Sequence, residues 1–170
     1  MMALLAMAWD GQWFLKVYEE FDWETAARLN ARVRAAFGRI EMRRMLRALG
    51  KPAADDVEDG VRIILTYFQE VLAAGFDADF TVEGDRVQVT IIRCAALLGC
   101  QRAGLERYDQ ACMACQGLWQ AYFEVLLPHS PVRTRAQEMM GHGASRCHIL
   151  IDMEGRENDE RLAGENGFQP

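Results

Sequence analysis

Apolar residues in the first 75 positions recur every three or four residues, which is the period of an α-helix. Asp10 and Asp22 each precede such a stretch, and Asp55 or Asp56 precedes a third; a short acidic side chain at this position caps a helix start. We therefore predict three helices. Their apolar faces hold Trp13, Phe14, Val17, Tyr18 and Phe21 in the first, Trp23, Ala26, Ala27, Val33 and Phe37 in the second, and Val61, Ile64, Leu65, Phe68, Val71 and Leu72 in the third.

Glycine and proline indicate where these helices end. The second pattern runs to Gly50 and Pro52, and a glycine followed closely by a proline is a common stop signal. Gly38 lies inside this pattern, so we expect it to break or kink the second helix. Gly75 is expected to end the third.

Beyond Gly75 the period changes to the two-residue alternation of a strand. The stretch FTVEGDRVQVTIIRC alternates at Val87, Val89 and Ile91 and carries the turn signal Glu83-Gly84-Asp85, which predicts a β-hairpin. A second hairpin is predicted from VRTRAQEMM and RCHILIDM, with GHGAS as the turn. Between the hairpins, residues 95–127 return to helical spacing.

The order of these elements predicts an α+β fold. A short helix around AALLGCQRAG and a longer one from Asp109 to about Leu126 separate the hairpins. We expect an antiparallel sheet of two hairpins covered by helices on one face and preceded by an N-terminal helical segment, 1–75. Residues 76–153 would form the cysteine-containing α+β ligand-binding domain, and the polar tail 154–170 is expected to be disordered.

The charge balance narrows the classes of partner. The 170 residues carry a formal net charge of −6, which makes nucleic acid an unlikely partner and disfavours anionic membranes. The basic stretch Arg28–Lys51 could still bind a phosphate, a nucleic acid or an acidic partner. We favour a solvated helix face paired with the acidic segment Asp55–Asp59, because no interleaved aromatic residues or glycine-rich phosphate loop accompany the charges.

The location predicted from the sequence is the cytoplasm, without a membrane partner. No run approaches the roughly 18 to 20 apolar residues that cross a bilayer. The opening MMALLAMAW also lacks the basic region that begins a signal peptide.

Five cysteines are the main candidates for chemistry, and in a reducing compartment they indicate thiols, metal ligands or buried packing rather than disulfides. Cys112 and Cys115 form a CxxC pair, whose two sulfurs can point at one metal ion. The hairpin ends could bring Cys94 and Cys147 beside them. We therefore predict a zinc site or an iron–sulfur cluster at Cys94, Cys112, Cys115 and Cys147, with Cys100 as a packing residue.

Several alternatives stay open for the cysteines. They could simply fill the core, or serve redox or nucleophilic chemistry, although a thioredoxin-like CxxC should follow a strand in a βαβ unit. His142 or His148 could replace one ligand, but strand alternation points His148 to the face opposite Cys147. The carboxylates near the cysteines in sequence are Glu106, Asp109, Glu124 and Glu138, of which Glu138 is the best placed.

Aromatic residues at helical spacing could line a ligand pocket, but they more often form a core. The sequence holds no GxSxG, HExxH or Walker-type motif, so it leaves open whether the protein is an enzyme. The aromatic candidates are Trp9, Trp13, Trp23, Tyr67, Phe68, Trp119, Tyr122 and Phe123, with Met139 and Met140 as deformable lining.

Three stretches, VEGDRVQVTIIRC, YDQACMAC and GHGASRCHILIDM, resemble the small-molecule-binding domain named after the 4-vinyl reductases of bacteriochlorophyll synthesis. This domain is also the sensor module of aromatic-responsive transcription activators. The full chain, including AWDGQWFLKVYEEFDWETAARLN, looks similar to uncharacterised bacterial and archaeal proteins grouped near the L-2-amino-thiazoline-4-carboxylic acid hydrolases.

The resemblance implies a buried cavity for a small apolar or aromatic ligand, a homodimer, and in the sensor members a zinc site built largely from cysteines. The matching positions are Cys94, Cys112, Cys115 and Cys147, although Ala95 follows Cys94 where the family often has proline. We expect a metal-bearing small-molecule-binding domain. The alternatives are a hydrolase of a small cyclic or thio-amide substrate, using a metal-bound water or a cysteine nucleophile, and a protein–protein adaptor.

Overall fold

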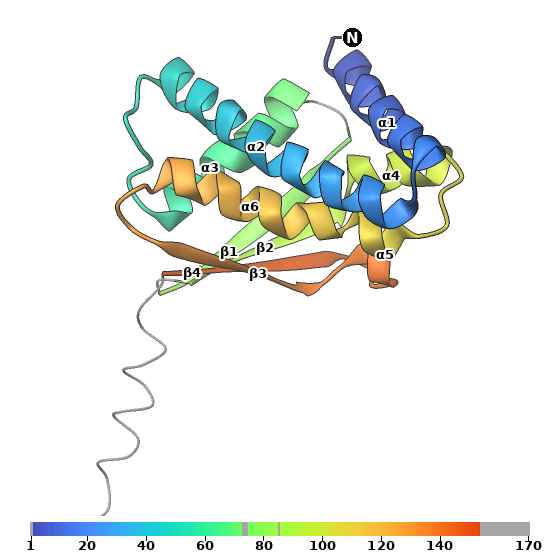
Figure 1. Cartoon of the computed structure of the whole chain (residues 1–170). Helices are drawn as coiled ribbons and strands as arrows, with labels where there is room; N and C mark the ends of the chain where they lie inside the picture. The colour runs from blue at the N-terminus through green and yellow to red at the C-terminus, as the bar shows by residue number, and fades with distance from the viewer. Residues whose placement is uncertain (1, 73–74, 85, 154–170) are drawn as a thin grey trace, which may run out of the picture.

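The computed structural model describes residues 2–72, 75–84 and 86–153 and shows an α+β fold, with helices on one side of a sheet (Figure 1). Helices, a hairpin, further helices and a second hairpin follow one another as predicted. The predicted disordered tail 154–170 lies outside the described residues. The elements are α1 (Met2–Glu20), α2 (Trp23–Leu49), α3 (Val57–Thr66), the π-helical η1 (Tyr67–Leu72), β1 (Asp77–Glu83), β2 (Arg86–Arg93), α4 (Ala95–Arg102), α5 (Tyr108–Ala111), α6 (Met113–Leu126), β3 (Val132–Glu138), the 3₁₀ helix η2 (Met140–His142) and β4 (Cys147–Met153).

The predicted helix caps are confirmed at Asp22, Gly50 and Asp56. Asp22 accepts the Thr25 N–H at 2.6 Å, and Asp56 caps α3 in the same way. Gly50 ends α2 with a φ of 67°, a left-handed conformation that glycine adopts without strain. The prediction that Asp10 caps the first helix is wrong, because α1 already begins at Met2: the alanines, leucines and methionines before Asp10 are strong helix formers.

Gly38 does not interrupt α2, contrary to the sequence prediction. The glycine is buried where α2 runs along α6, and a Cβ there would lie 2.6 Å from Leu118 Cδ1 and 3.0 Å from Tyr122 Cε1. The absence of a side chain therefore allows the two helices to pack closely. The third helix also departs from its prediction, since it widens into the π-helical turn η1 after Thr66.

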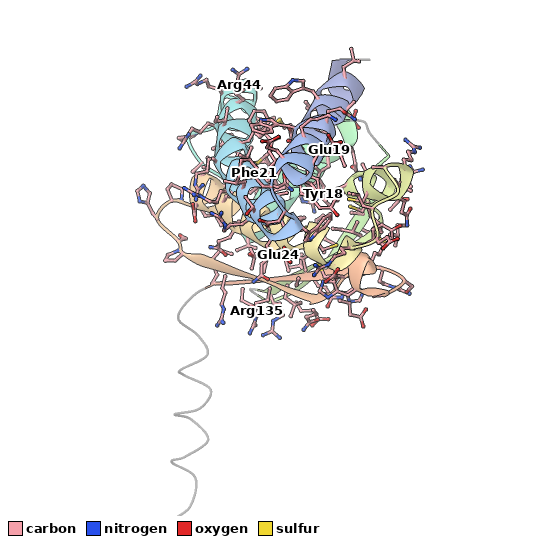
Figure 2. All side chains as sticks on the ribbon, turned by 45° about the vertical axis from the view of Figure 1, so that its right-hand side comes forward. Tyr18, Glu19, Phe21, Glu24, Arg44 and Arg135 are labelled. Carbon is pink, nitrogen blue, oxygen red and sulfur yellow. The ribbon has the colours of Figure 1, made fainter. Side chains whose placement is uncertain are left out.

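The sheet has the strand order β1-β2-β4-β3, and all three neighbouring pairs are antiparallel. The second hairpin therefore joins the first through β2 and β4, with Val89 opposite Ile149 and Ile91 opposite Cys147. The buried residues of β2 alternate with exposed or half-buried ones, whereas in β4 Leu150 is buried along with its neighbours Ile149 and Ile151. The helices cover one face of the sheet, as predicted (Figure 1). Arg135 of β3 points away from the helices on the opposite face (Figure 2).

Most of the aromatic candidates form the core between helices and sheet. Phe68 packs against Phe76, Trp119 and Tyr122, with ring centroids 4.4, 6.1 and 5.9 Å away. The buried aromatic residues are Trp23, Tyr67, Phe68, Trp119, Tyr122 and Phe123, whereas Trp9 and Trp13 are exposed on α1. In the part of the chain that the structure describes, no helix combines the length and the hydropathy needed to cross a bilayer.

Candidate functional site

The tight turn between β3 and β4 brings two cysteine sulfurs to neighbouring backbone amides. The N–H of Met140 donates to the sulfur of Cys147 at 3.2 Å, and the N–H of Gly141 donates to the sulfur of Cys112. Cys147 begins β4, whereas Cys112 lies at the break between α5 and α6, within the stretch predicted to be one helix. The η2 turn therefore links the start of the last strand to the start of the long helix.

Gly141 is required by the close approach of these segments. A Cβ at this position would lie 2.3 Å from the Cys112 sulfur and 2.6 Å from the Tyr108 carbonyl oxygen. Both distances are far below van der Waals contact, and the second involves a backbone atom that cannot rotate away. Any larger residue must therefore push α5 or η2 aside.

The four cysteines predicted as metal ligands come together at this end of the molecule. Cys94 follows β2, Cys115 lies in the first turn of α6, and Cys112 and Cys147 sit on the η2 amides. In every pair among the four, one thiol raises the pKa of the other through its proximity. The convergence that the element ends suggested is therefore present in the structure.

Burial is the main cause of the pKa shifts in this cluster. Burial raises the pKa of Cys112 to about 11. The Gly141 N–H opposes this increase, and the neighbouring Cys147 adds a smaller upward effect. Burial likewise raises the pKa of Cys115, Cys147 and, in α4, Cys100. These four thiols are therefore protonated near neutral pH.

The thiols are gathered without being arranged as ligands. Among the described residues, no group of three or more histidine, cysteine or acidic side chains has the spacing that holds a metal ion. The predicted ligand set Cys94, Cys112, Cys115 and Cys147 consequently stays a prediction. His148 lies on the opposite sheet face, as expected, where its Nδ1 is 3.4 Å from the Gln88 amide nitrogen.

A hollow of about 340 Å³ opens beside the cluster, between the start of α6, the end of β3 and the η2 turn. Glu138, the carboxylate favoured from the sequence, lines it together with Cys112 and His142. The His142 Nε2 lies 3.2 Å from the Asp109 carbonyl oxygen. A carbonyl oxygen only accepts hydrogen bonds, so in the neutral ring Nε2 is the donor and Nδ1 is left as an acceptor. The described lining residues are Cys112, Gln116, Ala136, Gln137, Glu138, Met139, His142 and Ala144.

Sequence reasoning missed two kinds of group at this site, the backbone N–H groups of the η2 turn and the side chain of Gln116. Gln116 belongs to no motif, and its position on the hollow depends on how α6 crosses β3. The glycine-rich turn was read only as a chain reversal, whereas Gly141 also provides an N–H for Cys112. The CxxC motif was the only sequence signal that pointed to the start of α6.

A second polar centre, also missed, lies inside the helical layer. Glu41 is 5 % exposed, and its two oxygens accept hydrogen bonds from the Tyr67 hydroxyl at 2.6 Å and the Tyr122 hydroxyl at 2.9 Å. Burial, together with Glu41, raises the pKa of both tyrosines far above the ordinary value, so they remain donors. Position 41 follows the helical spacing of the buried α2 residues, but glutamate is a residue type that is seldom buried.

The basic stretch Arg28–Lys51, which covers most of α2 and the residues just after it, is partly paired, in line with the favoured interpretation. Lys51 contacts Asp55 at 2.8 Å and Asp59 at 2.7 Å, in the acidic segment that precedes and opens α3. Arg39 instead pairs with Glu124 of α6 at 2.6 Å. Arg44 is exposed and extends from the far half of α2 (Figure 2).

Comparison with known proteins finds likeness at the level of the fold. No family model matches the chain, and no curated protein sequence matches it. A trafficking protein particle complex subunit 3 from Naegleria fowleri, solved covalently bound to palmitic acid, has a TM-score of 0.63 at 13% identity, covering 90% of this chain and 95% of that one. The phenol-responsive sensory domain of the transcription activator PoxR, solved with phenol, has a TM-score of 0.55 at 13% identity, covering 100% and 82%.

The α+β fold predicted from the order of the elements is thus shared with the PoxR sensory domain. At this identity the likeness extends to the fold alone, and the 4-vinyl reductase family itself stays a prediction.

Proposed function

We propose that this chain is a small-molecule-binding domain whose ligand binds in the hollow. The observation that carries the proposal is the convergence of a thiol, a carboxylate, an imidazole and amide side chains on one concave space of about 340 Å³. This volume lies near the lower end of ligand pockets, which span about 300 to 1,000 Å³. The shared fold of the PoxR sensory domain, solved with phenol, supports the same class of function.

The lining favours a small ligand that is neutral or positively charged. Glu138 supplies a carboxylate, and Gln116, Gln137 and His142 supply hydrogen-bonding groups, while no lysine or arginine is among the described lining residues. Met139 and two alanines provide apolar contact. The sequence predicted an apolar or aromatic ligand, but no described lining residue is aromatic, so we favour a ligand with N–H donors.

Ligand-detected NMR with four probes tests this proposal: benzamidine, benzylamine, phenol and benzoate. We expect the two cationic probes to bind the full chain and to lose at least about tenfold in affinity, roughly 1.4 kcal/mol, in Glu138→Gln. Glu83→Gln is the matched control, because Glu83 is an exposed carboxylate on β1, the far edge strand. Equal binding to both variants, or binding of benzoate alone, would contradict the proposal.

We propose metal binding by the four cysteines as a second candidate function. Its support is the mutual proximity of all four thiols and the two amide hydrogen bonds to sulfur, an outer-shell contact typical of metal–thiolate sites. Cys94, Cys112, Cys115 and Cys147 fit zinc or an iron–sulfur cluster by donor type, and their side chains would have to draw inward to bind it.

Elemental analysis and visible absorption of anaerobically purified protein test the metal proposal. We expect zinc, or iron with visible absorption, that disappears in the Cys112→Ser, Cys115→Ser double variant and persists in the control Cys100→Ser. Protein without either metal in all samples would contradict it. The hydrolase alternative gains no support from a thiolate, because the Cys112 thiol is protonated near neutral pH.

The homodimer implied by the resemblance stays a proposal, and the exposed apolar face of α1 and α2 is where we place it. Trp9 and Trp13 on α1 and Phe37 on α2 are all about half exposed or more. Exposed Glu20 and Arg28 put both signs of charge on these helices, so the surface can complement a second copy. Light scattering should show a dimer that dissociates in Phe37→Glu, whereas a monomeric wild-type chain would contradict this.

A further inference from the structure

The strand β3 lies at one edge of the sheet, so every second residue turns its backbone N–H and C=O away from β4. In the first half of the strand, the side-chain amide of Gln120 covers these groups. Its Nε2 donates to the Val132 carbonyl oxygen at 2.8 Å, and its Oε1 accepts the Thr134 N–H at 3.1 Å. An amide from α6 thus pairs with this edge through one donor and one acceptor, as the main chain of an added strand would.

The next outward-facing backbone groups of β3 belong to Ala136. Residues two apart in a strand turn their N–H and C=O to the same side, and the Thr134 N–H faces outward to Gln120. Ala136 therefore turns its N–H and C=O to the same open edge, and this residue lines the hollow. Gln116, one helical turn before Gln120 on the same face of α6, also lines the hollow. The hollow thus continues along the strand edge from the point where the Gln120 amide ends.

We propose that the ligand of the hollow is peptide-like, an extended unit of one N-acylated basic amino acid amide, and that it pairs with Ala136 as a residue of an added strand. The ligand N–H donates to the Ala136 carbonyl oxygen, and the ligand carbonyl oxygen accepts the Ala136 N–H. Opposite residues of an antiparallel pair exchange these same two bonds. The basic group of the ligand pairs with Glu138. This assignment of a ligand class rests on the proposed function, since it takes the hollow as the binding site.

The open edge has room for about one residue of an added strand. Gln120 occupies the edge on one side of Ala136. On the other side the register with β4 shifts between Ala136 and Glu138, and such a bulge interrupts regular pairing. A short stretch of this kind matches a hollow of about 340 Å³. The backbone bonds would bind any extended amide, whereas Glu138 would select a basic side chain.

Two small probes test the pairing on the unaltered full chain: Nα-acetyl-lysine methylamide and its ester analogue, in which oxygen replaces the lysine N–H. The probes have the same charge and length, and only the first can donate to the Ala136 carbonyl oxygen. We expect the ester to bind at least about fivefold more weakly, the effect of losing one hydrogen bond. NMR should also show slower exchange of the Ala136 amide proton when the amide probe binds, because this N–H becomes hydrogen-bonded.

Proline substitution tests the same pairing from the protein side. Ala136→Pro removes an outward-facing N–H, a position at which edge strands tolerate proline. The matched control is Val82→Pro on β1, the other edge strand. Cross-strand pairing links Val82 to Val87, Ile151 and Thr134 in one row of the sheet. Bonded and non-bonded pairs alternate along such a row, so Val82, like Thr134, turns its N–H to an open edge.

We expect Ala136→Pro to bind the amide probe at least about fivefold more weakly than wild type, and Val82→Pro to bind it as wild type does. Equal affinity of wild type for the amide and the ester, with binding that still depends on Glu138, would overturn the strand pairing and leave the proposed function intact. If neither probe nor benzamidine bound, both would be overturned. The probe comparison needs no substituted protein, so misfolding of a proline variant does not affect it.

Discussion

The two polar centres of this molecule differ in whether they are enclosed or open to molecules from outside. Glu41 with Tyr67 and Tyr122 is enclosed by α2, η1 and α6, and each carboxylate oxygen has a hydroxyl donor. The thiol cluster sits where the sheet, α6 and the η2 turn meet, and it opens on one side into the hollow. The first centre fixes how helices pack, whereas the second leaves side-chain groups available to a molecule from outside. Substitutions of side chains that line the hollow should therefore change binding, whereas substitutions at the packed positions of either centre should change stability.

The largest effect on stability is expected at Gly141, where the open centre is held together. Gly141→Ala forces a methyl group against the Cys112 sulfur and the Tyr108 carbonyl oxygen. We expect the free energy of unfolding, measured in urea, to fall by about 3 kcal/mol, the upper range for overpacking. Gly117→Ala is the control: its Cβ would meet open space in α6, so stability should rise by up to about 1 kcal/mol. Equal effects of the two would show that the η2 turn is not tightly packed.

Glu41→Leu probes the closed centre and comes second. The substitution leaves the Tyr67 and Tyr122 hydroxyls buried without their acceptor, which should lower the free energy of unfolding by about 2 kcal/mol. Adding Tyr67→Phe and Tyr122→Phe removes the unpaired donors and should restore part of that loss. A triple variant less stable than Glu41→Leu would contradict the hydrogen-bond explanation.

The third effect in size is expected from alkaline pH, which should weaken the enclosed centre of Glu41, Tyr67 and Tyr122. Both tyrosines have a folded-state pKa raised above the ordinary 10.0, so their contribution is fully present below pH 10 and is lost as the pH rises beyond it. In that range the unfolded chain releases protons that the native protein retains, and each tyrosine lowers stability by about 1.4 kcal/mol per pH unit. The double variant Tyr67→Phe, Tyr122→Phe should flatten the unfolding curve measured above pH 10. An unchanged slope would show that these hydroxyls are not shielded.

Local signals in the sequence predicted most of the fold but little of either polar centre. Alternation in the two hairpins and the caps at Asp22 and Asp56 depend on neighbouring residues, and the structure confirms them. Gly38 was misjudged because its role depends on α6, 80 positions away in sequence, and not on the α2 pattern. Glu41 was missed for the same reason. The cysteines were found because all four lie at element ends, which a correct element order brings together.

The smallest effect on stability is expected in the hollow itself. Glu138 is exposed, so Glu138→Gln should change the free energy of unfolding by no more than about 0.5 kcal/mol, the usual range for surface substitutions. The same variant should lose most of its affinity for benzamidine, because the carboxylate is the only acidic group among the described lining residues. Urea unfolding and probe binding measured on one preparation separate the two effects. A large stability loss would mean that Glu138 supports the β3 end, and the distinction between a structural centre and a binding centre would no longer hold.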